Sequence, residues 1–333
     1  MLNVAMLSYW HVHAEGYARQ LKKIDGVNIT AIWDENVDRG REQAQKLGIA
    51  FEEELDNILN RDDVDAVVVN APTNLHTQVM VPAARAGKHI FTEKVLAITV
   101  RECKEIAEAV EESGVKFCIS YPQRTMPYNL FAKKVVDEGL IGDITLLRIR
   151  NAHNGSVADW LPEHFYDPIE CGGGAMMDLG AHGMYLARWL LGEPLRVNSM
   201  FNNYTDRPVE DNAVSIIEFK NRAMAINETG FVSSHSPYSL ELYGTEGSLF
   251  VGGPENKVRL ISDKMDNKFK GWITPTELPK ALPSPIEQWV DGIVHNKQII
   301  FGLEDGIWLT ELMEAAYMSY KEKRVVEMDE IIS

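Results

Sequence analysis

The sequence has few cysteines and no long apolar run, and each absence narrows the class of protein. The three cysteines, Cys103, Cys118 and Cys171, are scattered and lack the paired spacing of a metal site or a disulfide framework. Such a chain suits a reducing compartment, so we expect a cytoplasmic protein. The N-terminal apolar stretch ends at Ser8 without a basic segment before it, and no stretch approaches the roughly 18 apolar residues of a membrane helix. We therefore expect neither a signal peptide nor a membrane helix.

Basic residues are also scarce. The chain has 33 Lys and Arg against 49 Asp and Glu, which gives a formal net charge of −16. A surface of this sign repels polyanions, which argues against a nucleic-acid or an anionic-membrane partner. The remaining composition, 45% hydrophobic and 25% charged, is typical of a globular protein, without internal repeats or low-complexity tracts. A length of 333 residues predicts two domains.

Residues 1–121 alternate short apolar runs with amphipathic stretches. The runs predict strands and the stretches between them predict helices. Uninterrupted apolar strands separated by helices indicate a doubly wound parallel sheet, whose ligands bind beyond the carboxyl ends of the strands. The expected strands are 3–7, 29–33, 66–70, 89–92 and 116–120, and the expected helices are 14–23, 37–47, 53–60, 77–86 and 99–113.

The pattern changes in residues 122–333. Longer strands with alternating polarity, separated by Gly-rich turns, predict an α+β domain with a large, mostly antiparallel open sheet. A helix after Asp178 would cover one face of this sheet, and the open face predicts a homodimer or homotetramer. The expected strands are 145–151, 197–203, 213–219, 223–229, 239–243, 248–251, 258–261 and 325–328, and the other expected helices are 128–138, 285–295 and 303–321.

The first strand-to-helix turn, Ser8 to His13, lacks all three glycines of the Gly-x-Gly-x-x-Gly pattern of dinucleotide-binding folds. Ser8 can still offer a hydroxyl and a backbone N–H. Trp10 and His13, however, are too large to let a pyrophosphate approach the backbone as closely as glycine does. His11 and His13 also resemble a pair of metal ligands, but the sequence offers no third ligand, and we predict no metal.

Polar residues follow three other strands at the same edge of the predicted sheet. Asp34 stands where an acidic residue bonds the ribose hydroxyls of an adenosine and repels a 2′-phosphate, which favours NAD over NADP. The alternative is that Asp34 caps the helix at 37–47. The loop 70–76 and the pair Glu93-Lys94 end two further strands. Lys94 could bond a substrate hydroxyl and stabilise an alkoxide, or it could be an ordinary surface lysine.

A glycine run precedes the helix of the second half. Gly172 to Gly174 permit a close approach of the backbone to a ligand. Asp178 and His182 lie four residues apart and share one helix face if both are helical. A histidine in the first turn would be kept neutral by the positive helix end and could accept a proton. Small residues at 180, 181 and 183 leave room for a flat ligand. The alternative is that Asp178 is a helix cap and His182 is incidental.

Taken together, these motifs resemble the Gfo/Idh/MocA family of NAD(P)-dependent sugar and polyol oxidoreductases over essentially the whole chain. The likeness rests on Ala71-Pro72-Thr73-Asn74-Leu75-His76, on residues 83–89, on Glu93-Lys94-Val95, on residues 172–182, and on the shorter segments 138–142, 209–212 and 242–247. The resemblance implies a Rossmann-like dinucleotide-binding domain over 1–121 and a substrate-binding and oligomerisation domain over 122–333. It also implies that His182 is the acid/base of hydride transfer, that Lys94 stabilises the oxyanion and that Asp178 supports both.

The remaining expected contacts fall into two groups. The cofactor is expected to touch Ser8, Tyr9, Trp10, His11, Val12, Asp34, Ala71, Pro72, Thr73, Asn74, His76, Glu93 and Lys94. The substrate is expected to touch Tyr121, Arg124, Asn151, His153, Trp160, His164 and Tyr185.

The chain departs from the family pattern at three places. The glycine fingerprint is missing, so the pyrophosphate must be held differently. Val95 replaces a proline that often follows a cis peptide bond, which predicts a different backbone path at Lys94. Tyr185 stands where the family commonly has aspartate.

Three functions remain open from the sequence. The first is an NAD-dependent dehydrogenase of a sugar, an inositol or a sugar derivative. The second is a redox-neutral enzyme that cleaves or epimerises a glycoside with retained NAD, and the third is an idle nucleotide-binding protein. Release of NADH during turnover separates the first from the second.

Overall fold

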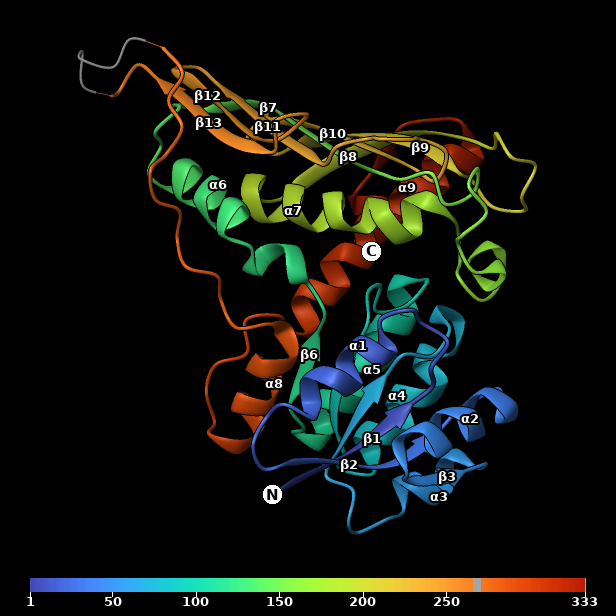
Figure 1. Cartoon of the computed structure of the whole chain (residues 1–333). Helices are drawn as coiled ribbons and strands as arrows, with labels where there is room; N and C mark the ends of the chain where they lie inside the picture. Colours follow the sequence, from blue (N-terminus) through green and yellow to red (C-terminus); the bar gives the residue numbers. More distant parts are fainter. Residues whose placement is uncertain (266–270, 333) are drawn as a thin grey trace. The chain divides into compact units, whose positions relative to one another are not determined.

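The computed structural model describes residues 1–265 and 271–332, and the chain divides into two units (Figure 1). The first unit holds residues 1–121 and 283–310, and the second holds 122–282 and the residues from 311 onward. Within the described ranges no helix has both the length and the apolar character needed to cross a membrane.

The first unit is a doubly wound sheet of six parallel strands, which confirms the fold predicted for residues 1–121. The strand order is β3-β2-β1-β4-β5-β6, so the order reverses between β1 and β4, where such sheets bind ligands. The strands are β1 (Leu2–Leu7), β2 (Val27–Trp33), β3 (Ala50–Glu52), β4 (Ala66–Val69), β5 (His89–Thr92) and β6 (Phe117–Ile119). The intervening helices are α1 (Ala14–Leu21), α2 (Val37–Leu47), α3 (Leu55–Leu59), α4 (His76–Arg85) and α5 (Val100–Ser113).

Residues 283–310 belong to the first unit, whereas the sequence analysis placed everything after residue 121 in a second domain. Helix α8 (Pro285–Val294) begins with a capping box at Ser284 and packs on α1, β5 and β6. Trp289 is fully buried, and its ring centroid lies 5.7 Å from that of Phe91. Periodicity shows that such a helix has an apolar side but does not show which sheet that side covers. This explains the difference.

The second unit is built on an eight-stranded sheet in the order β13-β12-β11-β7-β10-β9-β8-β14. Among the strands that the structure describes in this unit, only β7 and β10 pair in parallel and the other pairs are antiparallel, which confirms the predicted sheet type. The strands are β7 (Ile144–Ala152), β8 (Pro194–Asn202), β9 (Asn212–Phe219), β10 (Met224–Gly230), β11 (Ser239–Gly244), β12 (Gly247–Gly252), β13 (Lys257–Ser262) and β14 (Val326–Glu327).

Helices cover one face of this sheet and leave the other open (Figure 1). Helix α7 (Ala181–Leu191) packs on β7 and β10, as the sequence predicts, and α6 (Pro127–Asp137) packs on β12. Helices α9 (Leu303–Glu322) and α10 (Asp329–Ile332) close the chain. Strand β9 alternates buried and exposed residues, so its second set of apolar side chains, including Val214 and Ile216, faces outward.

Candidate functional site

The expected cofactor residues of the first unit lie at one edge of its sheet. They follow β1, β2, β4 and β5, and these four strands are parallel, so their carboxyl ends meet at the same edge. The turn after β1 is bonded to two of its neighbours there. The Tyr9 N–H donates to Asp34 Oδ2 at 2.8 Å, and the His11 N–H donates to the Asn70 carbonyl at 3.1 Å.

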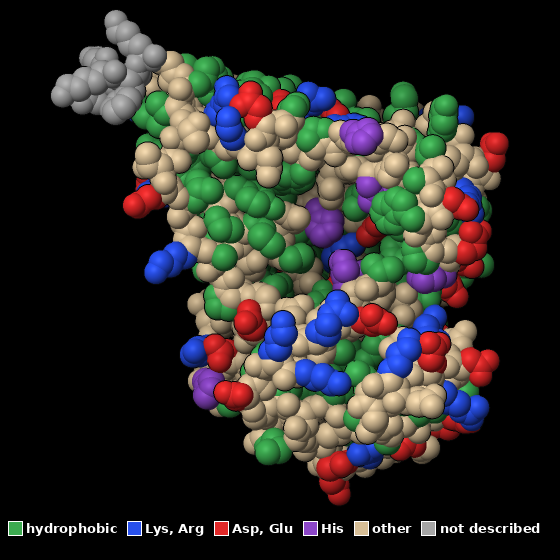
Figure 2. All heavy atoms as spheres, in the orientation of Figure 1, with side chains coloured by type: hydrophobic (Ala, Val, Ile, Leu, Met, Phe, Trp, Pro, Cys, Tyr) green, Lys and Arg blue, Asp and Glu red, His purple; other side chains and the backbone are tan. Residues whose placement is uncertain are grey.

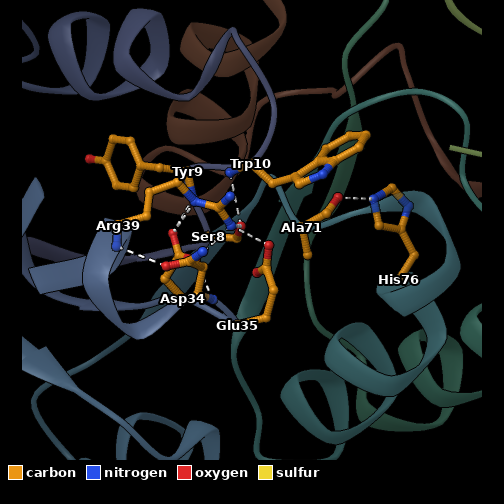
Figure 3. Close-up of polar contacts among 9 residues, drawn as sticks. Ser8, Tyr9, Trp10, Asp34, Glu35, Arg39, Ala71 and His76 are labelled. Atoms are coloured by element: carbon orange, nitrogen blue, oxygen red, sulfur yellow. Dashed lines mark hydrogen bonds and ion pairs between the residues drawn. The ribbon is translucent and has the colours of Figure 1, made fainter. Parts of the chain in front are cut away.

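The turn at Ser8 adopts a glycine-like conformation without glycine. Ser8 has a φ of 75°, a left-handed value that favours glycine, and its hydroxyl accepts the Trp10 N–H at 3.0 Å. The indole of Trp10 extends toward Ala71 on the neighbouring loop (Figure 3) and is 5% exposed. The shape of the turn is therefore kept, while the space that the second glycine would leave open is filled by an indole. The next two residues differ in exposure, because His11 is buried and Val12 is exposed.

Asp34 forms an ion pair with Arg39, a residue that the sequence analysis missed. Its carboxylate is 1% exposed and accepts two bonds from Arg39, from Nε at 3.0 Å and from Nη2 at 2.7 Å (Figure 3). It also accepts the Asn36 N–H at 2.8 Å, so it stabilises the start of α2. The cap itself is the Asn36 side chain, which accepts the Arg39 N–H. Asp34 lies before α2 and Arg39 lies within it, so no helical spacing in the sequence pairs the two residues.

The loop after β4 contains an unusual buried amide. Asn70 is fully buried, and neither polar atom of its side chain has a hydrogen-bond partner among the described residues. Asn74 Oδ1 is in the same condition. Buried polar atoms are seldom left unpaired, so this edge of the sheet suits a polar ligand. The remaining residues of the loop, Ala71, Pro72 and Thr73, are buried beside it.

The His76 side chain is directed into the interior of the first unit. Its Nδ1 lies 3.0 Å from the Leu96 carbonyl oxygen and its Nε2 lies 3.1 Å from that of Ala71 (Figure 3). The ring is 1% exposed, and burial lowers the pKa of His76. Both nitrogens therefore face backbone carbonyls, and the ring connects the loop to residue 96.

Glu93 gathers the polar groups of the first turn. Its Oε1 accepts the Tyr17 hydroxyl and lies 2.8 Å from His13 Nδ1 and 3.9 Å from His11 Nδ1. Burial raises the pKa of Glu93, but the two histidines outweigh burial and hold that pKa well below its usual value. The carboxylate is therefore ionised.

The structure also places a third potential metal ligand, Glu93, beside His11 and His13. One ligand atom each from His11, His13 and Glu93 lies within 4.8 Å of the others. This donor set suits a divalent transition metal. Glu93 Oε1 is already hydrogen-bonded within the cluster, so these three residues do not require a metal. The absence of a metal stays a prediction.

Lys94 follows Glu93 at the end of β5 and is 6% exposed. The Lys94–Val95 peptide bond is cis, so the expectation of a different backbone path was wrong. The Lys94 N–H donates to Glu93 Oε2 at 3.2 Å.

In the second unit the glycine run serves packing within the protein. A Cβ on Gly173 would lie 1.9 Å from the Tyr317 hydroxyl oxygen, and one on Gly174 would lie 2.1 Å from the Glu210 carbonyl oxygen. The side chain of Glu210, which the sequence analysis missed, accepts the N–H groups of Gly174 and Met176 at 2.9 and 3.0 Å. Packing within the protein therefore accounts for these two glycines. The approach of the backbone to a ligand, which the sequence analysis expected, is not needed to explain them.

Small residues further along the helix also face protein. A Cβ on Gly183 would lie 2.0 Å from Asn227 Oδ1 on β10, and one on Gly180 would lie 2.4 Å from Met176 Sδ. Ala181 is fully buried. This side of the helix therefore packs against the sheet and has no room for the flat ligand that the sequence analysis expected there.

The helical segment starts earlier than expected. A π-helical turn, η4 (Met176–Gly180), contains Asp178 and continues into α7, which contains His182. Asp178 is therefore not a helix cap. His182 lies beyond the first turn, where the effect of the positive helix end has faded, so that argument for a neutral imidazole does not apply.

His182 and Tyr185 contact each other. His182 Nδ1 lies 2.8 Å from the Tyr185 hydroxyl oxygen, and this oxygen also accepts the Gln123 N–H at 3.2 Å. Both side chains are largely buried. Tyr185 thus fixes one nitrogen of the imidazole.

The other expected substrate residues are spread over several elements. Asn151 is the next-to-last residue of β7, and its Nδ2 donates to the Leu179 carbonyl, next to Asp178, at 3.4 Å. The His153 ring centroid lies 4.6 Å from that of Trp160, which is 55% exposed. Burial lowers the pKa of His153 and outweighs the opposing effect of Asp178. His164 lies further along, in the turn η3 (Glu163–Tyr166).

Two other expected substrate residues, Tyr121 and Arg124, contact groups of the protein itself. The Tyr121 hydroxyl donates to the Asp305 carbonyl at 2.8 Å within the first unit, and Tyr121 is 1% exposed. The guanidinium of Arg124 lies over the Trp189 ring of α7, 5.2 Å from its centroid.

Family models match most of the chain. Residues 7–121 match the model described as an oxidoreductase family with an NAD-binding Rossmann fold. Residues 130–250 match the Gfo/Idh/MocA C-terminal domain.

Named relatives are similar over nearly the whole length. The scyllo-inositol 2-dehydrogenase (NAD(+)) of Bacillus subtilis (strain 168) is 29% identical, over 99% of this chain and 95% of the relative. The myo-inositol 2-dehydrogenase of Thermotoga maritima is 26% identical, over 95% and 96% of the two chains.

Solved structures share the fold. A putative NADPH-dependent oxidoreductase from Desulfitobacterium hafniense has a TM-score of 0.86 at 22% identity, over 100% of this chain and 99% of that one. Levoglucosan dehydrogenase in complex with NADH and levoglucosan has a TM-score of 0.85 at 23% identity, over 98% and 99% of the two chains.

Proposed function

We propose that this chain, which belongs to the Gfo/Idh/MocA family of NAD(P)-dependent oxidoreductases and is a dehydrogenase acting on CH–OH groups, oxidises a carbinol of a sugar, an inositol or a sugar derivative with NAD. The observation that carries the proposal is the similarity to two inositol dehydrogenases over at least 95% of the chain. No specific observation favours a redox-neutral enzyme or an idle nucleotide-binding protein.

The carboxyl edge of the first sheet fits a dinucleotide. The unpaired amide of Asn70 supplies a donor and an acceptor beside the first turn, and Asp34 lies at the end of the adjacent β2. Ser8, Tyr9, Trp10, His11, Val12, Glu93 and the loop 71–76 would complete that site, and bound nicotinamide supplies the hydride acceptor. Since Trp10 fills the space of the second glycine, we propose that the pyrophosphate lies against side chains rather than against bare backbone.

Charge and hydrogen bonding support the proposed catalytic roles. His182 would take the hydroxyl proton at Nε2, which requires Nδ1 to carry hydrogen, and the Tyr185 oxygen can accept that hydrogen at 2.8 Å. The ammonium of Lys94 would stabilise the developing alkoxide, and the carboxylate of Asp178 would support both cations.

Tyr185→Phe is expected to lower kcat about tenfold, because it removes one hydrogen bond, worth ~1.5 kcal/mol when a partner is charged. In the wild type the bond from His182 Nδ1–H to Tyr185 stabilises the protonated imidazole. Its loss should therefore lower the pKa of His182, and the acid limb of the kcat–pH profile should move to lower pH. Tyr204→Phe, at an exposed tyrosine, serves as the control. An unchanged pH profile would show that Tyr185 only fills space.

Cofactor choice depends on Asp34 and Arg39 in this proposal. The buried carboxylate of Asp34 disfavours the 2′-phosphate of NADP, so NAD is preferred. The guanidinium of Arg39 beside it attracts a 2′-phosphate and weakens this preference. Arg39→Ala is expected to raise the ratio of kcat/KM for NAD over NADP about tenfold, the effect of ~1.4 kcal/mol. The matched control is Arg41→Ala, on the same helix and bonded to the exposed Glu53. An equal ratio in wild type and Arg39→Ala would contradict the assignment.

We also propose that the open face of the second sheet joins two copies of the chain. Met200 and Val214 are paired across β8 and β9, so they lie on one face, and Ile216 lies on the same side of β9. These side chains are 78%, 38% and 44% exposed. An apolar patch of this kind is typical of an interface. Sedimentation of the wild type and of Ile216→Glu tests it, and a monomeric wild type would contradict it.

The function itself is tested by one screen. Sugars, inositols and sugar acids are offered with NAD and with NADP in parallel, and reduced cofactor is followed by absorbance. We expect release of NADH with at least one polyol. Product formation without reduced cofactor would instead indicate the redox-neutral chemistry.

A further inference from the structure

A cavity of about 520 Å³ lies in the second unit. It is lined by residues from the turn η2 (Pro122–Thr125), from the start of α6, from β7, from the β12–β13 hairpin and from the segment 274–278. Its volume falls in the range of ligand pockets, about 300 to 1,000 Å³. The residues used below are Gln123, Tyr128, Asn151, Tyr238, Lys257 and Leu278.

Two lining residues connect the cavity to the proposed catalytic groups of the same unit. The Gln123 N–H donates to the Tyr185 hydroxyl oxygen at 3.2 Å, and that oxygen lies 2.8 Å from His182 Nδ1. Asn151 Nδ2 donates to the Leu179 carbonyl at 3.4 Å, one residue after Asp178. An occupant of the cavity would therefore be adjacent to a group that reacts at His182.

The lining combines aromatic faces with amides. The rings of Tyr128 and Tyr238 have centroids 6.0 Å apart, at an interplanar angle of 52°. Gln123 Oε1 accepts the Tyr128 hydroxyl at 3.0 Å, so the amide Nε2 is the part of this side chain left to donate to a ligand. Figure 2 shows hydrophobic side chains gathered over the part of the second unit that α6 occupies. Flat apolar faces beside amides suit a sugar ring, which presents C–H groups on its faces and hydroxyls on its rim.

Charge argues against an anionic occupant. Lys257 is the one cationic residue of the lining, and its ammonium is 3.2 Å from Glu255 Oε2. A phosphate or a carboxylate in the cavity would have to compete with that acid, in a chain of net charge −16.

We infer that this cavity is a subsite for a second, neutral sugar ring, so that the preferred substrate is a glycosylated sugar or polyol. The inference rests on the proposed dehydrogenase function for its kinetic consequence. The binding of the second ring does not depend on hydride transfer.

The test compares pairs of substrates that differ by one sugar ring. Myo-inositol is paired with galactosyl-myo-inositol, glucose with maltose, and glucitol with maltitol. We expect the wild type to have a kcat/KM about tenfold higher for the longer member of at least one pair, the equivalent of one or two net hydrogen bonds. A wild type that turns over the shorter members equally well or better would overturn the subsite and leave the dehydrogenase intact.

Two substitutions at one rim residue make the test specific. Leu278 is 38% exposed, so Leu278→Trp can narrow the cavity without disturbing a core, whereas Leu278→Ala widens it. The ratio of kcat/KM between the two members of a pair should fall toward 1 in Leu278→Trp and stay high in Leu278→Ala. Tyr128→Ala should also lower the ratio, and Tyr204→Ala, outside the cavity, should not. A kcat/KM ratio that is the same in the wild type and in Leu278→Trp would contradict the inference.

A binding measurement separates this inference from the proposed function. Saturation-transfer NMR with maltose, which has two sugar rings, reports contacts of each ring with the protein and needs no turnover. Contacts of both rings in the wild type, with those of one ring lost in Leu278→Trp, would support the subsite even if no substrate is oxidised. Contacts of a single ring in both proteins would overturn it.

Discussion

His182→Ala is expected to lower kcat by about 10² to 10⁴, the contribution of one general acid or base. The imidazole is 9% exposed and fixed at Nδ1 by Tyr185, so no mobile water can easily replace it at the same place. Binding of NAD should persist, because the candidate cofactor residues are in the first unit and His182 is in the second. Steady-state kinetics gives the loss, and titration calorimetry with NAD gives the binding.

Lys94→Ala should lower kcat in the same direction, because removal of the ammonium leaves the alkoxide without its cation. Tyr204→Ala, at a tyrosine that is 74% exposed, is the control for handling and folding. Near-normal turnover in both His182→Ala and Lys94→Ala would remove the proposed mechanism. Loss of NAD binding together with activity in His182→Ala would show instead that the variant is misfolded.

Gly174→Ala is expected to have the largest effect on stability. The new Cβ would lie 2.1 Å from the Glu210 carbonyl oxygen and 2.8 Å from Val209 Cγ2, and the first of these is backbone that cannot rotate away. The turn must shift, which also strains the bond from the Gly174 N–H to the Glu210 side chain. Overpacking of about 1 to 3 kcal/mol and a weakened buried hydrogen bond together predict a loss of ~3 kcal/mol or more in the free energy of unfolding.

Gly302→Ala is the matched control, because nothing lies within 4 Å of the Cβ it would add. Urea unfolding of both variants measures the difference. Equal stability of the two variants would mean that the backbone near Glu210 yields at little cost, contrary to the packing described.

The layout of both sheets could be predicted because apolar pattern and sheet type are linked. Strand β4, Ala66–Val69, is apolar at every position and fully buried, whereas β9 alternates as expected for a sheet with one open face. Strand β3 and helix α10 are three and four residues long, too short for periodicity to register. The π-helical turn at Met176–Gly180 escaped because nothing in its composition differs from an α-helix.

For the candidate site, the sequence predicts where each residue lies along its own strand but not which residues of other elements contact it. The pattern placed Asp34 and Glu93 at strand ends, since that position depends on local sequence. Their partners were missed because they come from other elements. Arg39 reaches Asp34 from α2, and Tyr17 reaches Glu93 across 76 positions of the chain. Such pairs are set by tertiary contact, which one sequence does not reveal.

The way the first turn is held has a consequence for mutational scans of this chain. Where glycines shape such a turn, the backbone conformation comes from residues without side chains. Here the shape depends on Asp34, on Glu93 and on the Asn70 carbonyl, all of them buried. Substitutions at the two acids should therefore reduce protein abundance as well as cofactor affinity. A survey that records only expression level would class them as folding residues and overlook the cofactor contacts proposed for them.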